Sequence, residues 1–252
     1  MTAPIPRDIP DLPAVPGPPV LLPAPVPATA VVAPVRRPSA AVFRLLTAVT
    51  AAGGVALELL LGSPARVLSY FSVQATALLA VTMFLSATTA WRARRPLPSA
   101  VTGAALLYAV TGALVHHLLL AHTTPPFSMT GTTTAPERWH AQWTALQILH
   151  VLAPAAAVLD WLLFTPAARL RLRQTVAWLL YPLAYLAFVF TRAAFLPPSD
   201  PSRRLYPFLD VTSHGYRGSL ANTLLLGLAI YALALLLVAL DHTRPSPTRH
   251  RV

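Results

Sequence analysis

Six long apolar segments, separated by short polar stretches, dominate the sequence. They span residues 40–62, 68–90, 99–121, 140–164, 172–194 and 218–240. The length of each segment is close to that of a membrane-spanning α-helix, which needs about 20 residues to cross about 30 Å of hydrocarbon. A helix also satisfies its backbone hydrogen bonds within one segment, which a bilayer requires. The pattern therefore predicts an all-α membrane protein, a bundle of six transmembrane helices.

The composition agrees with a membrane location. Hydrophobic residues make up 55% of the chain and charged residues only 11%, whereas an ordinary soluble domain has about 25% charged residues. A net charge of +11 is also typical of nucleic-acid binding. The arginines, however, stand in short clusters between the apolar segments, as they do in loops that set membrane topology. We therefore expect membrane lipid as the partner and no nucleic acid.

Several kinds of catalytic centre are excluded by the residues present. The chain has no cysteine, so it has no thiolate metal ligands and no cysteine nucleophile. Phosphate-loop, His-Glu-x-x-His and dinucleotide-binding motifs are missing, and we expect neither a metal nor another cofactor. A Gly-x-Ser-x-Gly elbow is missing too, which excludes an α/β-hydrolase.

The chain divides into three regions. Residues 1–39 are rich in proline and alanine, and because proline blocks regular backbone pairing we expect a disordered cytoplasmic tail. This tail lacks the features of a signal peptide. Residues 40–241 form the predicted transmembrane domain, and residues 242–252 form a basic C-terminal tail. No pattern in the chain indicates a particular oligomeric state.

Arginine is unevenly distributed between the two sides of the membrane. The richer side has Arg36, Arg37, Arg92, Arg94, Arg95, Arg169, Arg171, Arg173, Arg244, Arg249 and Arg251. The other side has Arg66, Arg138, Arg203, Arg204 and Arg217, with Arg192 at its edge. Because cytoplasmic loops are enriched in basic residues, we expect a multi-pass protein of the cell membrane with both termini cytoplasmic. Loops 122–139 and 195–217 then face outward.

Polar side chains within the predicted helices gather in the outer half of the membrane. They are Glu58, Ser72, His116, His117, His150, Arg192 and Asn222. Polar groups in hydrocarbon are costly without partners, so we expect a polar cavity that opens toward the outer leaflet. On the fourth segment, Trp143, Gln147, Pro154 and Trp161 lie within about 60° of His150, which turns this face inward. An alternative role for His150 is an interhelical hydrogen bond that only holds the bundle together.

The second outer loop contains Arg203-Arg204-Leu205-Tyr206-Pro207-Phe208-Leu209-Asp210. One interpretation is a lid or headgroup-binding loop over the cavity, with Tyr206 in contact with substrate. The alternative is an aromatic belt at the membrane interface with a few ion pairs.

Several short segments resemble a known family. Tyr70-Phe71-Ser72-Val73-Gln74 resembles the Phe-Thr-Ile-Gln segment on the same helix of bacterial Pr6Pr membrane proteins. The match continues through His150-Val151-Leu152-Ala153-Pro154, Leu159-Asp160-Trp161-Leu162-Leu163, Tyr181-Pro182-Leu183-Ala184-Tyr185, Tyr206-Pro207-Phe208-Leu209-Asp210 and Gly215-Tyr216. Together these segments span about residues 68 to 240.

The resemblance carries an expectation about activity. The Pr6Pr family is similar to the FAR-17a/AIG1-like eukaryotic proteins, which include membrane hydrolases of fatty-acid esters of hydroxy fatty acids. Those enzymes are described as using a threonine nucleophile and a histidine within the membrane. The resemblance implies that Ser72 stands at the position of the threonine and His150 at that of the histidine. It thus implies an intramembrane Ser/Thr-type hydrolase of fatty-acid esters.

The chemistry of these two residues suits such a reaction. A serine hydroxyl becomes a nucleophile when a base takes its proton, and histidine has a pKa near neutrality. An amphiphilic ester would be the substrate. Gln74, His116 and Asn222 are candidate donors to the oxyanion, although Gln74 lies about 200° around the helix from Ser72.

Two other functions use the same residues. A lipid or small-molecule transporter or binding protein would use the cavity without chemistry, although transporters often show inverted repeats and midplane sites, and helices 1–3 and 4–6 show no repeat. In a structural membrane component, the polar groups would only join helices.

The arginine distribution makes the topology testable with reporter fusions. Fusions at Arg95, Arg173 and the C-terminus are expected to report a cytoplasmic location. A fusion near Thr132 is expected to report an external one. Consistently reversed signals would overturn the predicted orientation.

Overall fold

The computed structural model describes residues 35–123, 127–130, 138–197, 200, 203 and 205–245. Most of the predicted N-terminal tail and most of the C-terminal tail lie outside these residues. The described part of the tails is short: Val35–Arg37 precede the first helix, and the last helix runs to Thr243.

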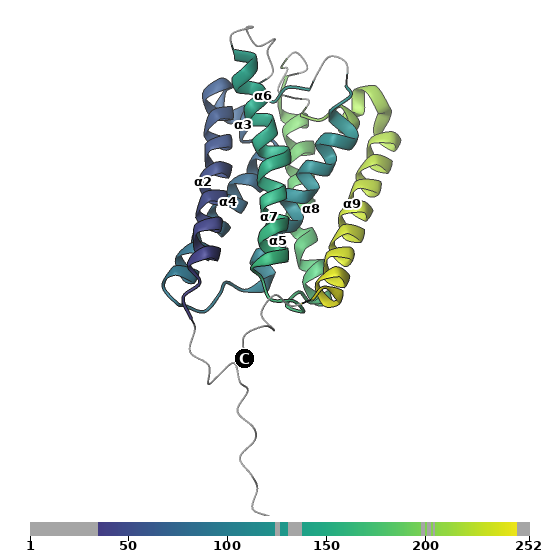
Figure 1. Ribbon diagram of the computed structural model, residues 1–252. Coiled ribbons are helices and arrows are strands. Elements are labelled where there is room, and N and C mark those ends of the chain that lie inside the picture. Colours follow the sequence, from purple (N-terminus) through teal and green to yellow (C-terminus); the bar gives the residue numbers. More distant parts are fainter. Residues whose placement is uncertain are drawn as a thin grey trace, which may run out of the picture. The chain divides into compact units, whose positions relative to one another are not determined.

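Helices make up most of the described chain (Figure 1). They are α2 (Pro38–Leu61), α3 (Pro64–Val67), α4 (Phe71–Trp91), α5 (Ser99–Val115) with the π-helical turn η1 (His116–Leu120), α6 (Trp139–Gln147), the π-helical turn η3 (Ile148–Leu152), α7 (Ala153–Leu163), α8 (Leu172–Phe195), the 3₁₀ turn η5 (Pro207–Leu209) and α9 (Val211–Thr243). Within the described ranges, six continuous helical segments are long and apolar enough to span a membrane. The predicted all-α architecture is confirmed, and the chain is an integral multi-pass membrane protein.

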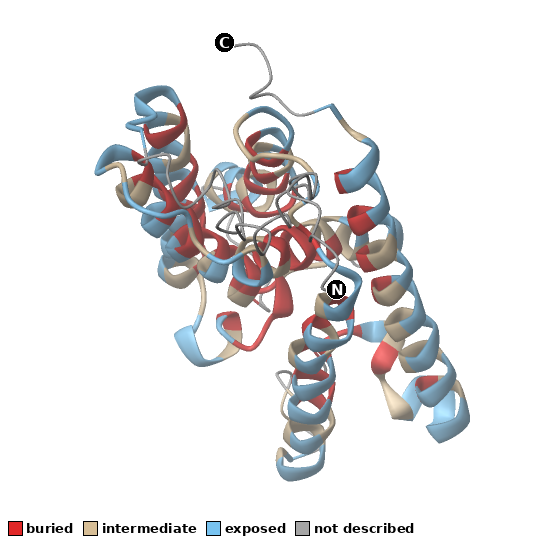
Figure 2. Cartoon of the chain, turned by 90° about the horizontal axis from the view of Figure 1, so that it is seen from below, coloured by how far each residue is buried: buried red, intermediate tan, exposed pale blue. Residues whose placement is uncertain are grey.

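The helices form one bundle with an apolar exterior. α4 packs between α2 and α5, the α6–η3–α7 segment packs against both α2 and α5, and α8 pairs with α9. Viewed along the bundle, buried residues line the inner faces of the helices and exposed residues the outer ones (Figure 2). Many of the exposed residues are large and hydrophobic, as Leu224, Leu225 and Leu228 are on α9. An outer surface of this kind is stable in lipid and not in water.

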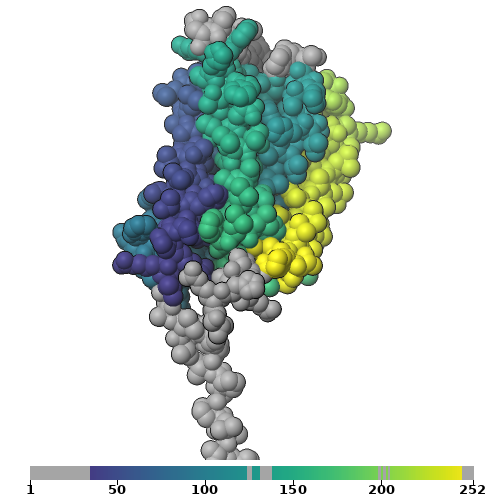
Figure 3. All heavy atoms as spheres, viewed as in Figure 1, coloured from purple at the N-terminus to yellow at the C-terminus, as the bar shows by residue number. Residues whose placement is uncertain are grey.

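Successive spanning helices run in opposite directions, so the bundle has two distinct ends. We call them the Arg37 end, where α2 begins, and the Ser72 end, where α4 begins. On the face shown in Figure 3, side chains of α2 and of the α6–α7 segment meet along much of the bundle.

The last helix is longer than its apolar segment and is broken near its start. Asp210 caps α9 by accepting a hydrogen bond from the Thr212 amide at 2.9 Å. Gly215 then has φ 67° and ψ 170°, which interrupts the helical backbone. Glycine is suited to this conformation, because a side chain with a Cβ is strained at positive φ. The sequence prediction began the segment at residue 218, since the polar residues before it lower the hydropathy.

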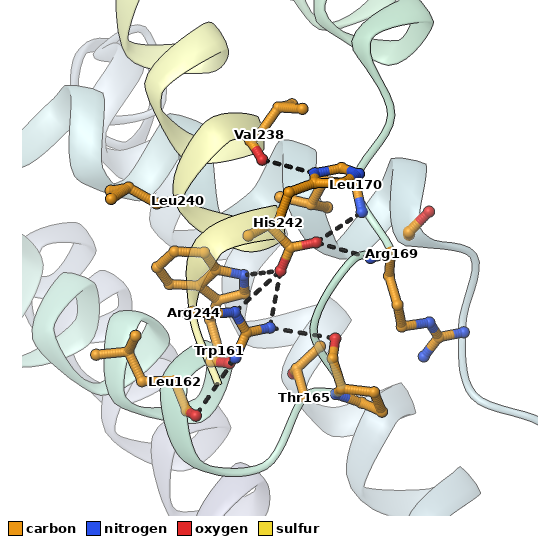
Figure 4. A network of polar contacts seen from close by, with 12 residues as sticks. Trp161, Leu162, Thr165, Arg169, Leu170, Val238, Leu240, His242 and Arg244 are labelled. Atoms are coloured by element: carbon orange, nitrogen blue, oxygen red, sulfur yellow. Dashed lines mark hydrogen bonds and ion pairs between the residues drawn. The ribbon is translucent and has the colours of Figure 1, made fainter. Parts of the chain in front are cut away.

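A buried carboxylate closes the Arg37 end (Figure 4). Asp241 accepts hydrogen bonds from the Trp161 indole at 3.0 Å, the Arg169 amide at 2.7 Å and the Leu170 amide at 2.8 Å. It also forms an ion pair with Arg244 at 2.8 Å. These contacts fasten the end of α9 to α7 and to the loop between α7 and α8. Asp241 could not be singled out from the sequence, because Trp161, Arg169 and Leu170 are about 70 to 80 residues away along the chain.

Replacing Asp241 tests this closure. Asp241→Ala removes the carboxylate that pairs with the largely buried Arg244 guanidinium and leaves two backbone amides without their acceptor. Removing one partner of a buried ion pair costs about 3–5 kcal/mol. We therefore expect a large fall in the unfolding midpoint in detergent. The control Arg173→Ala, at an exposed position of the same end, should change stability by less than about 0.5 kcal/mol. Equal stability of the two variants would contradict a structural role for the Asp241 network.

Candidate functional site

The start of α4 is buried and held by two tyrosines. The Phe71 amide donates to the hydroxyls of Tyr185 and Tyr206, each at 3.1 Å. The Tyr185 hydroxyl in turn donates to the Ser69 carbonyl at 2.8 Å. A helix leaves its first backbone amides without intrahelical partners, and these need an acceptor when water is absent. The tyrosines supply it and bring α8 and the loop before α9 against α4.

Ser72 occupies the second position of α4 and is buried. Its hydroxyl contacts the Met129 sulfur at 3.6 Å, a weak acceptor that a polar ligand can replace. Amides in the first turn point out of the helix start, and this end carries partial positive charge. The location therefore favours negative charge developing next to Ser72.

His150 lies in the π-helical turn η3, which ends two residues before Pro154. Pro154 has no N–H to donate to the carbonyl four residues earlier, which is that of His150, and the chain forms η3 at this point. His150 is buried, and its Nδ1 lies 3.1 Å from the Leu146 carbonyl. A carbonyl can only accept, so Nδ1 carries the proton and Nε2 is the basic nitrogen of the neutral ring.

Gly54 lets η3 approach α2 closely. A Cβ at this position would lie 2.8 Å from Leu149 Cδ1 and would also collide with Ile148. Small residues allow such close approach between membrane helices. This contact fixes the turn that carries His150.

A second π-helical turn places His116 on His150. The two imidazole rings stack with centroids 4.0 Å apart and an interplanar angle of 19°. His116 lies in η1 and His150 in η3, so each ring comes from an irregular turn. Such turns are frequent at functional sites. Two positive charges at this separation would repel each other, so at most one ring of the pair is in the positively charged imidazolium form.

Ser72 and His150 line the same cavity. It has a volume of about 40 Å³, which exceeds the about 10–15 Å³ that one water needs. Its lining also includes Phe71, Thr111, Gly112, Val115, Leu120, Pro182, Tyr185, Leu186, Tyr206, Phe208, Leu209, Leu226 and Ile230. Most of these side chains are apolar, and the polar ones are Ser72, Thr111, His150, Tyr185 and Tyr206.

A larger apolar groove adjoins this cavity. It has a volume of about 350 Å³ and lies between α5–η1 and α9. It shares Thr111, Val115, Phe208, Leu226 and Ile230 with the cavity. Its other lining residues are Leu114, Leu118, Leu119, Asn222, Leu225, Ala229 and Leu233. The two spaces are therefore neighbours that share part of one apolar wall, and the polar groups of Ser72 and His150 belong to the smaller one.

The other residues proposed from the sequence lie at different distances from this cavity. Tyr206 lines it, whereas His116 is not among the lining residues and stacks on His150. Asn222 lines the groove and donates to the Phe208 carbonyl at 2.7 Å, so it holds η5 against α9. Gln74 is not among the cavity residues. It donates to the Leu68 carbonyl at 2.7 Å and accepts from the Tyr181 hydroxyl at 2.6 Å, as its position around the helix indicates.

Some residues of the site were not singled out from the sequence. Thr111 lines both the cavity and the groove, and its buried hydroxyl has no partner among the described residues. Tyr185 was quoted only within a family segment, and Met129 was not considered. Glu58 is fully buried and both of its carboxylate oxygens are without a hydrogen-bond partner in the described part of the chain. It lies on α2, outside the cavity lining.

The polar side chains that line the cavity are hydroxyl groups and one imidazole. Burial raises the pKa of the Tyr206 hydroxyl, which therefore stays protonated near neutral pH and can donate a hydrogen bond. Across the described ranges, no three His, Asp or Glu side chains come together as a metal site would require. The arrangement offers a hydroxyl, a neutral base and hydrogen-bond donors.

No family model matches the chain, and no curated protein or solved structure matches it.

Substitution at Gly112 tests the size of the cavity. A Cβ at this position would lie 3.5 Å from both Cα and Cβ of Ser72, an ordinary contact. We expect Gly112→Ala to keep the melting temperature within a few degrees of wild type. The side chain introduced by Gly112→Leu is too large for the cavity, and overpacking of this kind lowers stability by about 1–3 kcal/mol. Thermal unfolding in detergent measures both, and equal stability of the two variants would show that the space beside Ser72 is larger than described.

Proposed function

We propose that the protein is an intramembrane hydrolase of fatty-acid esters, with Ser72 as nucleophile and His150 as base. The observation that carries the proposal is the cavity lined by both side chains, which adjoins an apolar groove. The start of α4 adds the positive end of a helix next to the hydroxyl.

The reaction follows from these groups. His150 Nε2 takes the proton of the Ser72 hydroxyl as its oxygen attacks the ester carbonyl carbon. The resulting oxyanion is stabilised by amides in the first turn of α4 and by the Tyr206 hydroxyl. The carbonyl re-forms as the alcohol leaves with the proton from His150. Water then attacks the acyl-serine, His150 accepts its proton and returns it to Ser72, and the fatty acid is released.

The groove determines which esters reach Ser72. An acyl chain from the bilayer already lies in apolar surroundings, so its transfer into the groove gains little hydrophobic free energy. The groove would instead orient the chain so that its carbonyl reaches the polar cavity, an effect that lowers the barrier by positioning. Asn222, which lines the groove near η5, and His116, beside the base, are the other proposed substrate contacts.

The family resemblance supports the same activity. The segment from Tyr70 to Gln74 is similar to the Pr6Pr segment, and through it to the FAR-17a/AIG1-like hydrolases with threonine at the position of Ser72. The proposed orientation places both termini in the cytoplasm and the Ser72 end in the outer leaflet, where a substrate from that leaflet would enter sideways.

A second candidate is a non-enzymatic protein that binds or transports lipid. The observation that favours it is the bonding of His150 within the bundle, because its Nδ1 contacts its own helix and its ring stacks on His116. The ring stack also joins η3 to η1, as a purely structural role would require.

Mutants of the proposed pair separate these functions. Ser72→Ala, His150→Ala and the double mutant are expected to lose ester hydrolysis to a similar floor, because nucleophile and base act as a unit and effects of such residues are not additive. Each loss should be at least about 10²-fold. Ser72→Thr should keep part of the activity, since it keeps the hydroxyl. The measurement is release of fatty acid from a lipid ester, together with labelling by a serine-reactive fluorophosphonate.

Ser69→Ala is the matched control. Ser69 is a buried serine near the start of α4, and its hydroxyl donates to the Ala65 carbonyl outside the cavity. It should keep both labelling and hydrolysis. Full activity of Ser72→Ala would make the nucleophile assignment wrong. A folded wild type that neither hydrolyses esters nor takes the probe would favour the binding protein.

A further inference from the structure

A second polar cavity lies at the Arg37 end of the bundle, away from Ser72 and His150. It has a volume of about 60 Å³, again well above the about 10–15 Å³ of a single water site. Three arginines contribute to its wall: Arg37 before α2, Arg44 on α2 and Arg169 in the loop between α7 and α8. Asp160 and Asp241 also line it.

The positive charges in this wall are not balanced by the two carboxylates. Asp160 is paired with the Arg44 Nε at 2.7 Å, and Asp241 is paired with Arg244 at 2.8 Å. Within the described ranges, the guanidinium groups of Arg37 and Arg169 have no hydrogen-bond partner. In Figure 4, no dashed line reaches the guanidinium of Arg169, although its backbone amide belongs to the Asp241 network.

The unpaired charges are close enough to act on one another. Burial lowers the pKa of Arg169, and repulsion from Arg37 and Arg44 adds to this effect, while Asp241 opposes it. Because a guanidinium does not lose its proton in proteins, the repulsion remains until an anion offsets it.

Hydroxyl groups complete the wall. Thr82 and Ser86 are one turn apart on α4, so they lie on the same face, and both line the cavity. They are only 3% and 6% exposed, and the described residues offer no hydrogen-bond partner to either hydroxyl. Buried hydroxyls normally have partners. Two unpaired ones that face a cavity are therefore available to a polar ligand.

The first turn of α5 adds a further positive contribution. Ser99 and Thr102 line the cavity, and α5 begins at Ser99. The start of a helix favours a bound anion, because its amides lack intrahelical partners and its dipole is positive there. Residues from α2, α4, α5 and the α7–α8 loop thus converge with the same preference.

We propose that this cavity binds a phosphate group, held by Arg37, Arg44 and Arg169 and by the hydroxyls of Thr82 and Ser86. Guanidinium groups bind phosphate through paired N–H donors. A phosphate monoester presents several acceptor oxygens and a charge near −2 at neutral pH, which matches two unpaired guanidiniums and two free hydroxyls. The group can come from a soluble phosphate or from the headgroup of an anionic lipid.

Binding to the purified full-length protein tests the proposal in two arms. The first adds inorganic phosphate in neutral detergent, with chloride keeping the ionic strength constant. The second adds phosphatidic acid in mixed micelles, with phosphatidylcholine as the neutral comparison. The melting temperature as a function of concentration gives the apparent Kd, because a ligand of the native state stabilises by mass action.

Arg169→Gln and Ser86→Ala are the test variants, and Arg173→Gln is the matched control. A hydrogen bond to a charged group contributes enough for its loss to raise Kd about tenfold or more. Arg173 is exposed at the same end and does not line the cavity, so its loss should change Kd less than about threefold, since exposed charges are screened. Without ligand, Arg169→Gln should melt near wild type, because its side chain has no partner to lose.

The two arms distinguish the source of the phosphate. Saturable stabilisation by inorganic phosphate that weakens in Arg169→Gln supports a soluble ligand. Stabilisation by phosphatidic acid alone, with the same loss, supports a lipid headgroup. No stabilisation in either arm, or equal weakening in Arg169→Gln and Arg173→Gln, would overturn the proposal.

Discussion

The amide of Phe71, shared by the hydroxyls of Tyr185 and Tyr206, is the interaction on which the Ser72 end depends. α4 begins among buried residues, where water does not reach its first amides. Leaving such a group unsatisfied costs about 1–3 kcal/mol, and two tyrosines from distant parts of the chain remove that cost. Their rings also form part of the cavity wall. The same contacts that permit a buried helix start therefore create the space around Ser72.

The Arg37 end follows the same rule with a different outcome. There the Asp241 carboxylate satisfies two backbone amides of the α7–α8 loop and the Arg244 guanidinium, so the end of α9 is closed. Beside it, the Arg169 guanidinium and the Ser86 hydroxyl line a cavity and have no hydrogen-bond partner in the part of the chain that the structure describes. The polar groups around Asp241 are thus paired with one another, whereas those that line the cavity are available to the proposed ligand. Polar groups in a membrane bundle are informative because each one is either paired or available.

The spans and the grouping of Ser72 with His150 could be predicted, because length, hydropathy and depth along a helix are local properties of the sequence. Which side chains of different helices contact each other at a given depth could not be predicted in the same way. The stack of His116 on His150 depends on two π-helical turns, and a regular 100° per residue does not describe them. The network of Asp241 joins segments far apart in the chain, for which hydropathy carries no information.

Gly215 has a consequence for how the cavity is covered. Its backbone angles are not helical, so α9 consists of a short first turn and a long part that lines the groove, joined at this kink. The 3₁₀ turn Pro207–Leu209, which supplies Phe208 and Leu209 to the cavity wall, precedes this break. Asn222, which lies beyond the break, donates to the Phe208 carbonyl at 2.7 Å, so the kink allows the covering turn to fold back onto the groove-lining part of the same helix. The covering turn is thus held by the helix that lines the groove, and uncovering the cavity requires this hydrogen bond to break.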